Sequence, residues 1–135
     1  MLGLPRTAML GLHALKALGR DEGPLSSGTL SREVHVYPSQ VARLLRLLKA
    51  AGLVASAGHK GWILARPAGE ITVLEAVEAL GMSRPHPEDC AVGSSCPDRG
   101  ACALAPLCRR MHESLIDVFR GLTLADLRAE LPALP

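Results

Sequence analysis

The sequence predicts a mainly helical fold with one small β-hairpin. Apolar residues recur at the three- and four-residue spacing of an amphipathic helix along several stretches of the chain. Hydrophobic residues make up 48% of the 135 residues but aromatic residues only 2%. The core is therefore expected to consist of Leu, Ala and Val, which suits packed helices. Two short apolar segments that flank a turn at residues 58–61 indicate the hairpin.

Three helices are predicted in the first part of the chain. Leucines at helical spacing predict the first over residues 6–19, before an Asp-Glu-Gly-Pro breaker. Ser27 or Thr29 is expected to cap a short second helix that ends near Val34. Pro38 suits the first turn of a third helix, because its missing N–H costs nothing there. The buried stripe of that third helix is Val41, Leu44, Leu45 and Leu48.

Two short helices joined by a tight turn, the second of them basic, form the skeleton of a helix–turn–helix. The polar residues that lie off the apolar stripe of the second one are Gln40, Arg43, Arg46 and Lys49. Taken alone, this face fits either a recognition helix for the DNA major groove or an ordinary solvated surface. The hairpin at residues 53–65 favours the recognition helix, because a hairpin directly after a helix–turn–helix is a wing. His59 and Lys60 are expected at its tip, near the DNA backbone or minor groove.

Charge is divided unevenly along the chain. Residues 1–66 hold nine Lys or Arg and three Asp or Glu, whereas residues 67–135 hold six and ten. A basic first part is the electrostatic pattern of a phosphate-binding module. The sequence contains no run of 18 apolar residues, so it predicts no membrane span. The apolar start of the chain contains His13 and Lys16 and lacks the cleavage site of a signal peptide, so we expect a cytoplasmic protein with reduced thiols.

The second part of the chain contains two further predicted helices around an irregular segment. Thr72 and Glu75 have the spacing of a capping box and begin a helix that extends to Leu80. Residues 81–103 lose all periodicity, and Pro106 begins a long helix. Its apolar stripe is Leu107, Met111, Leu115 and Val118. A short terminal helix is predicted to begin at Thr123.

All four cysteines of the chain fall within 19 residues, and five residues separate each from the next. They are Cys90, Cys96, Cys102 and Cys108. Proline and glycine exclude a helix through the first three, so a loop is expected to direct several thiolates to one centre. Thiolates select zinc, copper(I) or iron–sulfur clusters. Structural zinc takes closer cysteine pairs than these, and the wide spacing favours a cluster. Unmetallated thiols or disulfides are the alternative.

The chain resembles the IscR/NsrR-type family of iron–sulfur winged-helix repressors. The matching stretches are PSQVARLLRLLKAAGLVASAG, GWILARPAGEITVLEAVEAL, C-x₅-C-x₅-C with A-x-A-P-L, and the closing GLTLADL. The resemblance implies a homodimer in which Cys90, Cys96 and Cys102 ligate a 2Fe–2S or 4Fe–4S cluster. It implies operator DNA as the partner, with Ser39 and Gln40 near base edges and Arg43 and Arg46 on guanine or phosphate.

The fourth cluster ligand and the wing depart from the pattern of the family. Ala105 stands where some members have a ligating His, and Met9 aligns with an acidic ligand of others. The remaining candidates are His13 from the partner chain and Cys108, with His112 behind them. The wing lacks the usual Arg and an extra Gly, and Ala42 occupies a position that is often acidic. These departures imply a different DNA target or a weaker wing contact.

The sequence therefore predicts one domain with three regions. A winged helix–turn–helix occupies residues 1–80, a cysteine-rich cluster-binding loop residues 81–104, and a dimerisation helix with a C-terminal segment residues 105–135. The protein is predicted to be a transcriptional regulator that acts as a repressor. Its binding to the operator is predicted to be controlled by an iron–sulfur cluster that senses iron, redox state or nitric oxide. The alternative is the same fold sensing through thiol oxidation, zinc or a protein partner. No nucleophile motif or phosphate-cradling loop indicates an enzyme.

Overall fold

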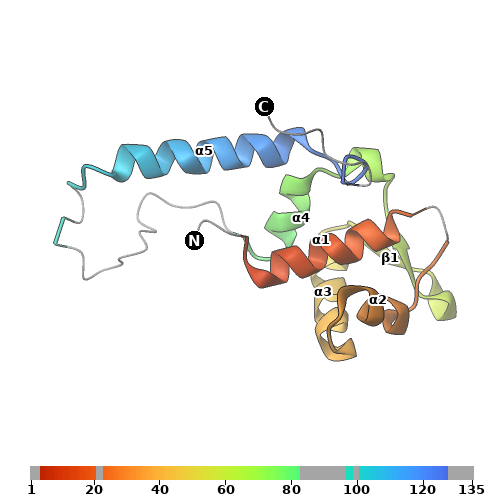
Figure 1. The fold of residues 1–135 in the computed structure, drawn as a ribbon. Coiled ribbons are helices and arrows are strands. Elements are labelled where there is room, and N and C mark those ends of the chain that lie inside the picture. The colour runs from red at the N-terminus through yellow and green to blue at the C-terminus, as the bar shows by residue number, and fades with distance from the viewer. Residues whose placement is uncertain (1–3, 21–22, 83–96, 99–100, 128–135) are drawn as a thin grey trace.

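Helices make up most of the structure, which is a computed structural model (Figure 1). It describes residues 4–20, 23–82, 97–98 and 101–127. Three helices come first in the chain, namely α1 (Arg6–Leu18), α2 (Ser27–Val34) and α3 (Pro38–Ala50). The buried face of each follows the apolar stripe of its sequence, since burial of that stripe stabilises an amphipathic helix. The three predicted helices and the tight connection between the second and third are confirmed.

A capping hydrogen bond begins α2, and residues with positive φ follow α2 and α3. Ser26 caps α2, one residue before the predicted Ser27, and its Oγ accepts the backbone N–H of Thr29 at 3.1 Å. His35 ends α2 in the left-handed region with a φ of 55°. Gly52 follows α3 with a φ of 75°, which glycine adopts without steric cost.

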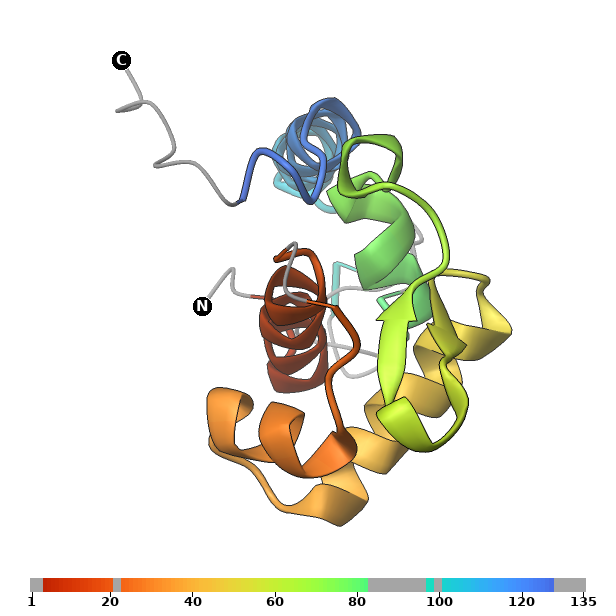
Figure 2. The ribbon, with the colours of Figure 1, turned by 90° about the vertical axis from the view of Figure 1, so that its right-hand side faces the viewer.

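A two-stranded antiparallel sheet follows α3 and forms the predicted wing (Figure 2). Strand β1 (Val54–Ser56) pairs along its whole length with β2 (Trp62–Leu64). Between the strands lies one turn of 3₁₀ helix, η1 (Gly58–Lys60). A hydrogen bond of 2.7 Å from the N–H of Ala57 to the carbonyl of Gly61 closes the turn. The tip of the wing is therefore a tight, hydrogen-bonded structure.

A residue from before α2 pairs with the wing, which the sequence did not reveal. The N–H of Leu25 donates to the carbonyl of Trp62 at 3.0 Å, and the N–H of Trp62 donates back at 2.8 Å. The indole Nε1 of Trp62 donates to Ser27 Oγ at 3.2 Å. Gly61 permits this approach, because a Cβ there would lie 2.3 Å from the carbonyl oxygen of Leu25. These contacts fasten the wing to the start of α2.

Helices α4 (Val73–Ala79) and α5 (Ala105–Gly121) come from the second part of the chain. The predicted capping box is present at α4, where Thr72 Oγ1 accepts the N–H of Glu75 at 3.1 Å and the Glu75 carboxylate accepts the N–H of Thr72 at 3.0 Å. Figures 1 and 2 show α5 beside α4, on the side of the molecule opposite to α2 and α3. The long helix predicted near Pro106 is confirmed.

The short terminal helix predicted from Thr123 is wrong over the residues that the structure describes. Residues 124–127 form a turn, and Thr123 pairs with Thr72 in an isolated β-bridge. The backbone N–H of Leu124 donates to Ile71 at 2.9 Å, and Leu124 itself is buried. The N–H of Ala125 donates to the carbonyl of Ala68 at 3.3 Å, and that of Asp126 donates back to Thr123 at 3.1 Å, so this segment forms a turn that is held against residues 68–71.

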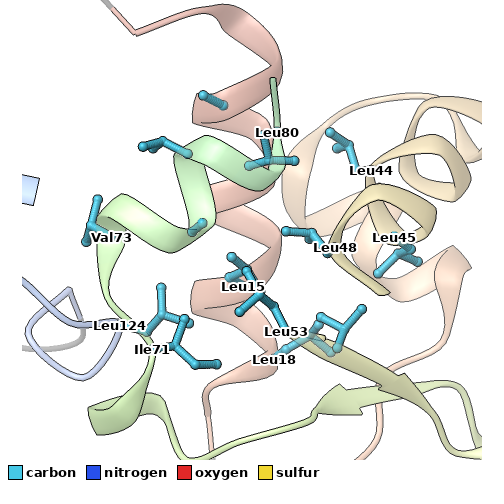
Figure 3. Packing of buried hydrophobic residues seen from close by; sticks show 14 of the residues in the cluster. Leu15, Leu18, Leu44, Leu45, Leu48, Leu53, Ile71, Val73, Leu80 and Leu124 are labelled. Carbon is cyan, nitrogen blue, oxygen red and sulfur yellow. The ribbon is translucent and has the colours of Figure 1, made fainter. Parts of the chain in front are cut away.

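The hydrophobic core lies where α1, α3, α4 and the start of the wing meet (Figure 3). Its largest fully buried side chains are Leu15, Leu30, Val41, Leu45, Leu48, Leu53, Ile71, Val77 and Leu124. Figure 3 shows Leu15 of α1 beside Leu53, and Ile71 beside Leu124. Truncating such a buried leucine to alanine costs roughly 2–5 kcal/mol of stability. The core is aliphatic, as the low aromatic content predicts.

A glycine of α1 lies against the residue that ends α4. A Cβ on Gly11 would lie 2.2 Å from Cδ1 of Leu80, so the Leu80 side chain occupies the space that any larger residue would need. Both residues are buried. Leu80 directly follows α4, and the chain continues from there toward the cysteine-rich segment. The Gly11 contact thus fixes the point from which that segment leaves the fold.

We predict that Gly61→Ala destabilises the protein more than Gly58→Ala. Both glycines have positive φ, at 112° and 64°, so each substitution introduces backbone strain. Nothing lies within 4 Å of a Cβ on Gly58, whereas a Cβ on Gly61 meets the backbone of Leu25. We expect a loss of about 1 kcal/mol for Gly58→Ala and roughly 3 kcal/mol or more for Gly61→Ala. Urea unfolding followed by circular dichroism measures both, and equal losses would contradict the wing-to-α2 contact.

Candidate nucleic-acid interface and metal centre

One face of α3 is exposed, polar and basic. The structure confirms that Ser39, Gln40, Arg43 and Arg46 are exposed, opposite the buried leucines of the same helix. Within the described part of the chain, neither Arg43 nor Arg46 makes an ion pair or a side-chain hydrogen bond. Their guanidinium groups are therefore free to bind an external acceptor. Planar guanidinium groups suit both the guanine edge and phosphate oxygens.

The wing lies beside α3, so its tip and the basic helix face belong to one region (Figure 2). His59 and Lys60 are exposed on η1, at the tip where the sequence predicts them. Lys49 of α3 places its Nζ 6.0 Å from the ring centroid of Trp62, at the outer limit of a cation–π contact. The predicted interface residues of α3 and the wing are thus held on a scaffold of helix and sheet.

Tyr37 was not singled out by the sequence analysis, although its position is distinctive. It is the only tyrosine of the chain and 77% exposed. It directly precedes Pro38, at the N-cap of α3, and its side chain makes no capping hydrogen bond. An aromatic residue just before the N1 proline of a basic helix is the signal that could have found it. Tyr37 extends the exposed α3 surface toward the turn that follows α2.

An apolar strip lies exposed along α5. Fractional exposure is 56% for Leu107, 38% for Met111, 39% for Leu115 and 54% for Val118. The only side chain of α5 that is fully buried is Phe119, near the end of the helix that packs on α4. Solvent-exposed apolar rows of this length indicate a protein contact surface.

The structure describes two of the four cysteines. Cys90 and Cys96 lie outside the described residues. Cys102 is partly buried just before α5, where its carbonyl accepts the N–H of Ala105 at 3.2 Å. Cys108 is exposed on α5, and both described cysteines are free thiols. Thiolate sulfur is the ligand that iron–sulfur clusters take, so these two residues have the donor chemistry that a cluster needs.

The histidine candidates lie on different helices. His13 is exposed on α1, and His112 is partly buried on α5. Among the described residues, no three His, Cys, Asp or Glu side chains are grouped as metal ligands.

The junction between β2 and α4 is held by an ion pair next to the capping box. Arg66 Nη2 lies 2.7 Å from Glu75 Oε1, and both side chains are about two-fifths exposed. The backbone N–H of Thr72 lowers the pKa of the Glu75 carboxyl below its ordinary value, and Arg66 lowers it further. An ion pair this exposed contributes little stability by itself, but with the cap it fixes where α4 begins.

Comparison with known protein families finds a match over residues 4–130. It is the Rrf2 family, whose description is iron-dependent transcriptional regulator. The chain belongs to the Rrf2 family. It is accordingly a transcriptional regulator, and the winged-helix resemblance inferred from its motifs is confirmed. A search of curated protein sequences finds no match.

Solved structures of Rrf2 regulators have the same fold. IscR of T. potens is 25% identical, with a TM-score of 0.73 over 93% of this chain and 85% of that one. CymR, the global cysteine regulator of B. subtilis, is 23% identical, with a TM-score of 0.77 over 96% of this chain and 98% of that one. CymR of Staphylococcus aureus is 22% identical, with the same TM-score over 96% and 100%. The mainly helical fold with a two-stranded sheet is therefore confirmed.

Within the described ranges, no helix has the length and apolar run that crossing a lipid bilayer takes.

Proposed function

We propose that this Rrf2 regulator represses transcription by binding a palindromic operator as a homodimer, with α3 in the major groove and the wing on the flanking backbone. The observation that carries the proposal is the exposed basic face of α3, whose Arg43 and Arg46 have no partner among the described residues. A recognition helix has this property before it meets DNA. Regulation by DNA binding places the protein in the cytoplasm and requires no catalysis.

Each exposed residue has a defined role in this proposal. Ser39 and Gln40 stand at the amino-terminal end of α3 and approach base edges. Arg43 and Arg46 bind guanine or phosphate farther along the helix. His59 and Lys60 at the wing tip contact the backbone, which adds affinity without sequence preference.

The second element of the proposal is an iron–sulfur cluster, 2Fe–2S or 4Fe–4S, held by Cys90, Cys96 and Cys102. Three observations support it: the family is described as iron-dependent, the fold is similar to that of IscR, and Cys102, the one of these three donors that the structure describes, is a free thiol. The fourth ligand is His13 of the partner subunit or Cys108. When bound, the cluster would supply a connection that is sensitive to oxygen, nitric oxide and iron. The cysteines would join the loop of one subunit to the first helix of the other if His13 completes the set.

Sensing through thiols without a cluster is the second candidate. Cys108 is exposed and Cys102 partly exposed, so both are accessible to oxidants. The fold is also similar to both CymR structures and to the oxidized form of S. aureus CymR. Zinc binding or a protein partner are further versions of this candidate, and all of them lack the colour of an iron–sulfur protein.

The homodimer in the proposal uses the exposed strip of α5. Helix α5 packs chiefly on α4 among the described elements, and its exposed apolar strip is free to pack against the same helix of a second copy. The proposed division of the chain follows from this arrangement. Residues 1–80 bind DNA, residues 81–104 bind the cluster, and residues 105–135 provide the dimerisation helix and the C-terminal segment.

DNA binding is tested with Arg43→Ala and Arg46→Ala. A duplex selected by the wild-type protein from a random pool provides the probe, and gel shift or fluorescence anisotropy gives the affinity. Loss of a bidentate contact costs about 1–3 kcal/mol, so we expect a roughly tenfold or greater loss for at least one variant. Arg120→Ala on α5 is the matched control, because it removes one exposed positive charge on the opposite side of the molecule. Unchanged affinity in both variants would refute α3 as the recognition helix.

Dimerisation is tested with Leu107→Glu and Leu115→Glu. A buried charge without a partner is strongly unfavourable, so we expect dissociation to monomers, measured by sedimentation at micromolar concentration with and without iron. Glu113→Gln, an exposed change on the same helix, is the control and should stay dimeric. A wild-type protein that sediments as a monomer under both conditions would contradict the proposed use of α5.

The cluster ligands are tested by anaerobic purification, iron and sulfide analysis and an absorption spectrum. Cys90→Ala, Cys96→Ala and Cys102→Ala are expected to abolish the cluster while the helical circular dichroism of the winged helix persists. His13→Ala is expected to leave a more labile cluster, and Cys108→Ala to have a smaller effect. Loss of the cluster in Cys108→Ala but not in His13→Ala would place all four ligands in one chain. A colourless wild-type protein with intact thiols would favour thiol sensing.

A further inference from the structure

A basic pocket lies at the corner where the start of α1, the end of α2 and the start of α3 meet. Its volume is about 660 Å³, and the side chains that matter for its chemistry are Arg6, Arg32, His35, Tyr37 and Gln40. The first four of these residues have no role in the DNA contacts proposed above. The pocket is thus a concave feature that the family assignment leaves unexplained.

The charge of this corner pocket is positive and uncompensated. None of the residues that line it is acidic. Arg6 is exposed and has no ion-pair partner among the described residues. Arg32 makes only a weak hydrogen bond to Thr29 Oγ1 on its own helix, at 3.4 Å. Two guanidinium groups around one concavity favour a ligand with several anionic oxygens, because guanidinium donors bind such groups in a fork.

The position of the pocket indicates where such a ligand comes from. Gln40 lines the pocket and also belongs to the exposed face of α3 that is proposed to read bases. A duplex that contacts this face would therefore bring its sugar–phosphate backbone past the corner. Tyr37, which is 77% exposed, lines the pocket at the N-cap of α3 and adds a hydroxyl donor there.

We propose that the corner pocket receives a phosphate group of the DNA backbone, bound by Arg6 and Arg32 with Tyr37 beside it. The proposal rests on the DNA binding proposed above and deepens it. A phosphate held here would set the register of α3 in the groove without reading sequence. Arg6 and Arg32 are then positioning residues that α1 and α2 contribute to an interface otherwise built from α3 and the wing.

The salt dependence of DNA binding tests this pocket. The two pockets of a dimer hold two phosphates, so Arg6→Ala combined with Arg32→Ala should make the slope of log Kobs against log salt shallower by about 1.8. Either substitution alone should make it shallower by a smaller amount, because the other arginine still pairs with the phosphate. Affinity is expected to fall roughly tenfold, and equally for the selected duplex and for a scrambled one. Arg6→Lys, which keeps the charge, is expected to restore most of the slope.

The control is Lys16→Ala on the same helix. Lys16 is exposed ten residues after Arg6, about 15 Å along α1, and does not line the pocket. It is expected to leave the slope unchanged. Wild-type slopes in Arg6→Ala and Arg32→Ala, with the selected duplex still bound, would overturn the pocket alone. A wild-type protein that selects no duplex would instead refute the proposed DNA binding, and the pocket assignment with it.

A second arm separates a DNA phosphate from a free phosphorylated molecule. Inorganic phosphate replaces chloride at constant ionic strength, and its binding to the DNA-free protein is followed by calorimetry. Weak or undetectable binding together with the shallower slope supports the backbone as the source. Tight binding that Arg6→Ala abolishes, with the DNA slope unchanged, would overturn the proposal in favour of a small phosphorylated ligand.

Discussion

The close packing of α4 against α1 determines where the second part of the chain lies. Gly11 has no side chain, and the space beside it is filled by Leu80. Helix axes approach more closely at such a glycine than at any larger residue. Since Leu80 directly follows α4, the cysteine-rich segment leaves the fold at a fixed point beside α1, the helix that also carries His13 and Arg6. The point where that segment begins and the basic corner pocket thus both lie beside α1.

Periodic burial made the helices predictable from the sequence. Each of the main helices repeats its apolar residues for at least two turns, and the capping box of Thr72 and Glu75 is a local signal. The Leu25 bridge and the turn after Thr123 could not be predicted in this way. Both depend on single residues whose partners are distant in the sequence, and no local pattern records such pairs.

The candidate interface was predictable to different degrees. Exposure of Arg43 and Arg46 followed directly from the apolar stripe of α3, so the helix pattern sufficed. The corner pocket was not predictable, because Arg6, Arg32 and Tyr37 come from three helices whose arrangement depends on the core. For the metal centre the spacing of cysteines predicts a shared site, and two of the cysteines lie outside the described residues.

The way the wing is built has a consequence for the energetics of association. Its turn is closed by the Ala57–Gly61 hydrogen bond, and Leu25 and Ser27 hold β2 from the other side. A loop that is already ordered has little conformational entropy left to lose when it contacts a ligand. His59 and Lys60 would therefore be presented to a duplex at a small entropic cost. The short wing of this protein therefore has limited reach but is preorganised for binding.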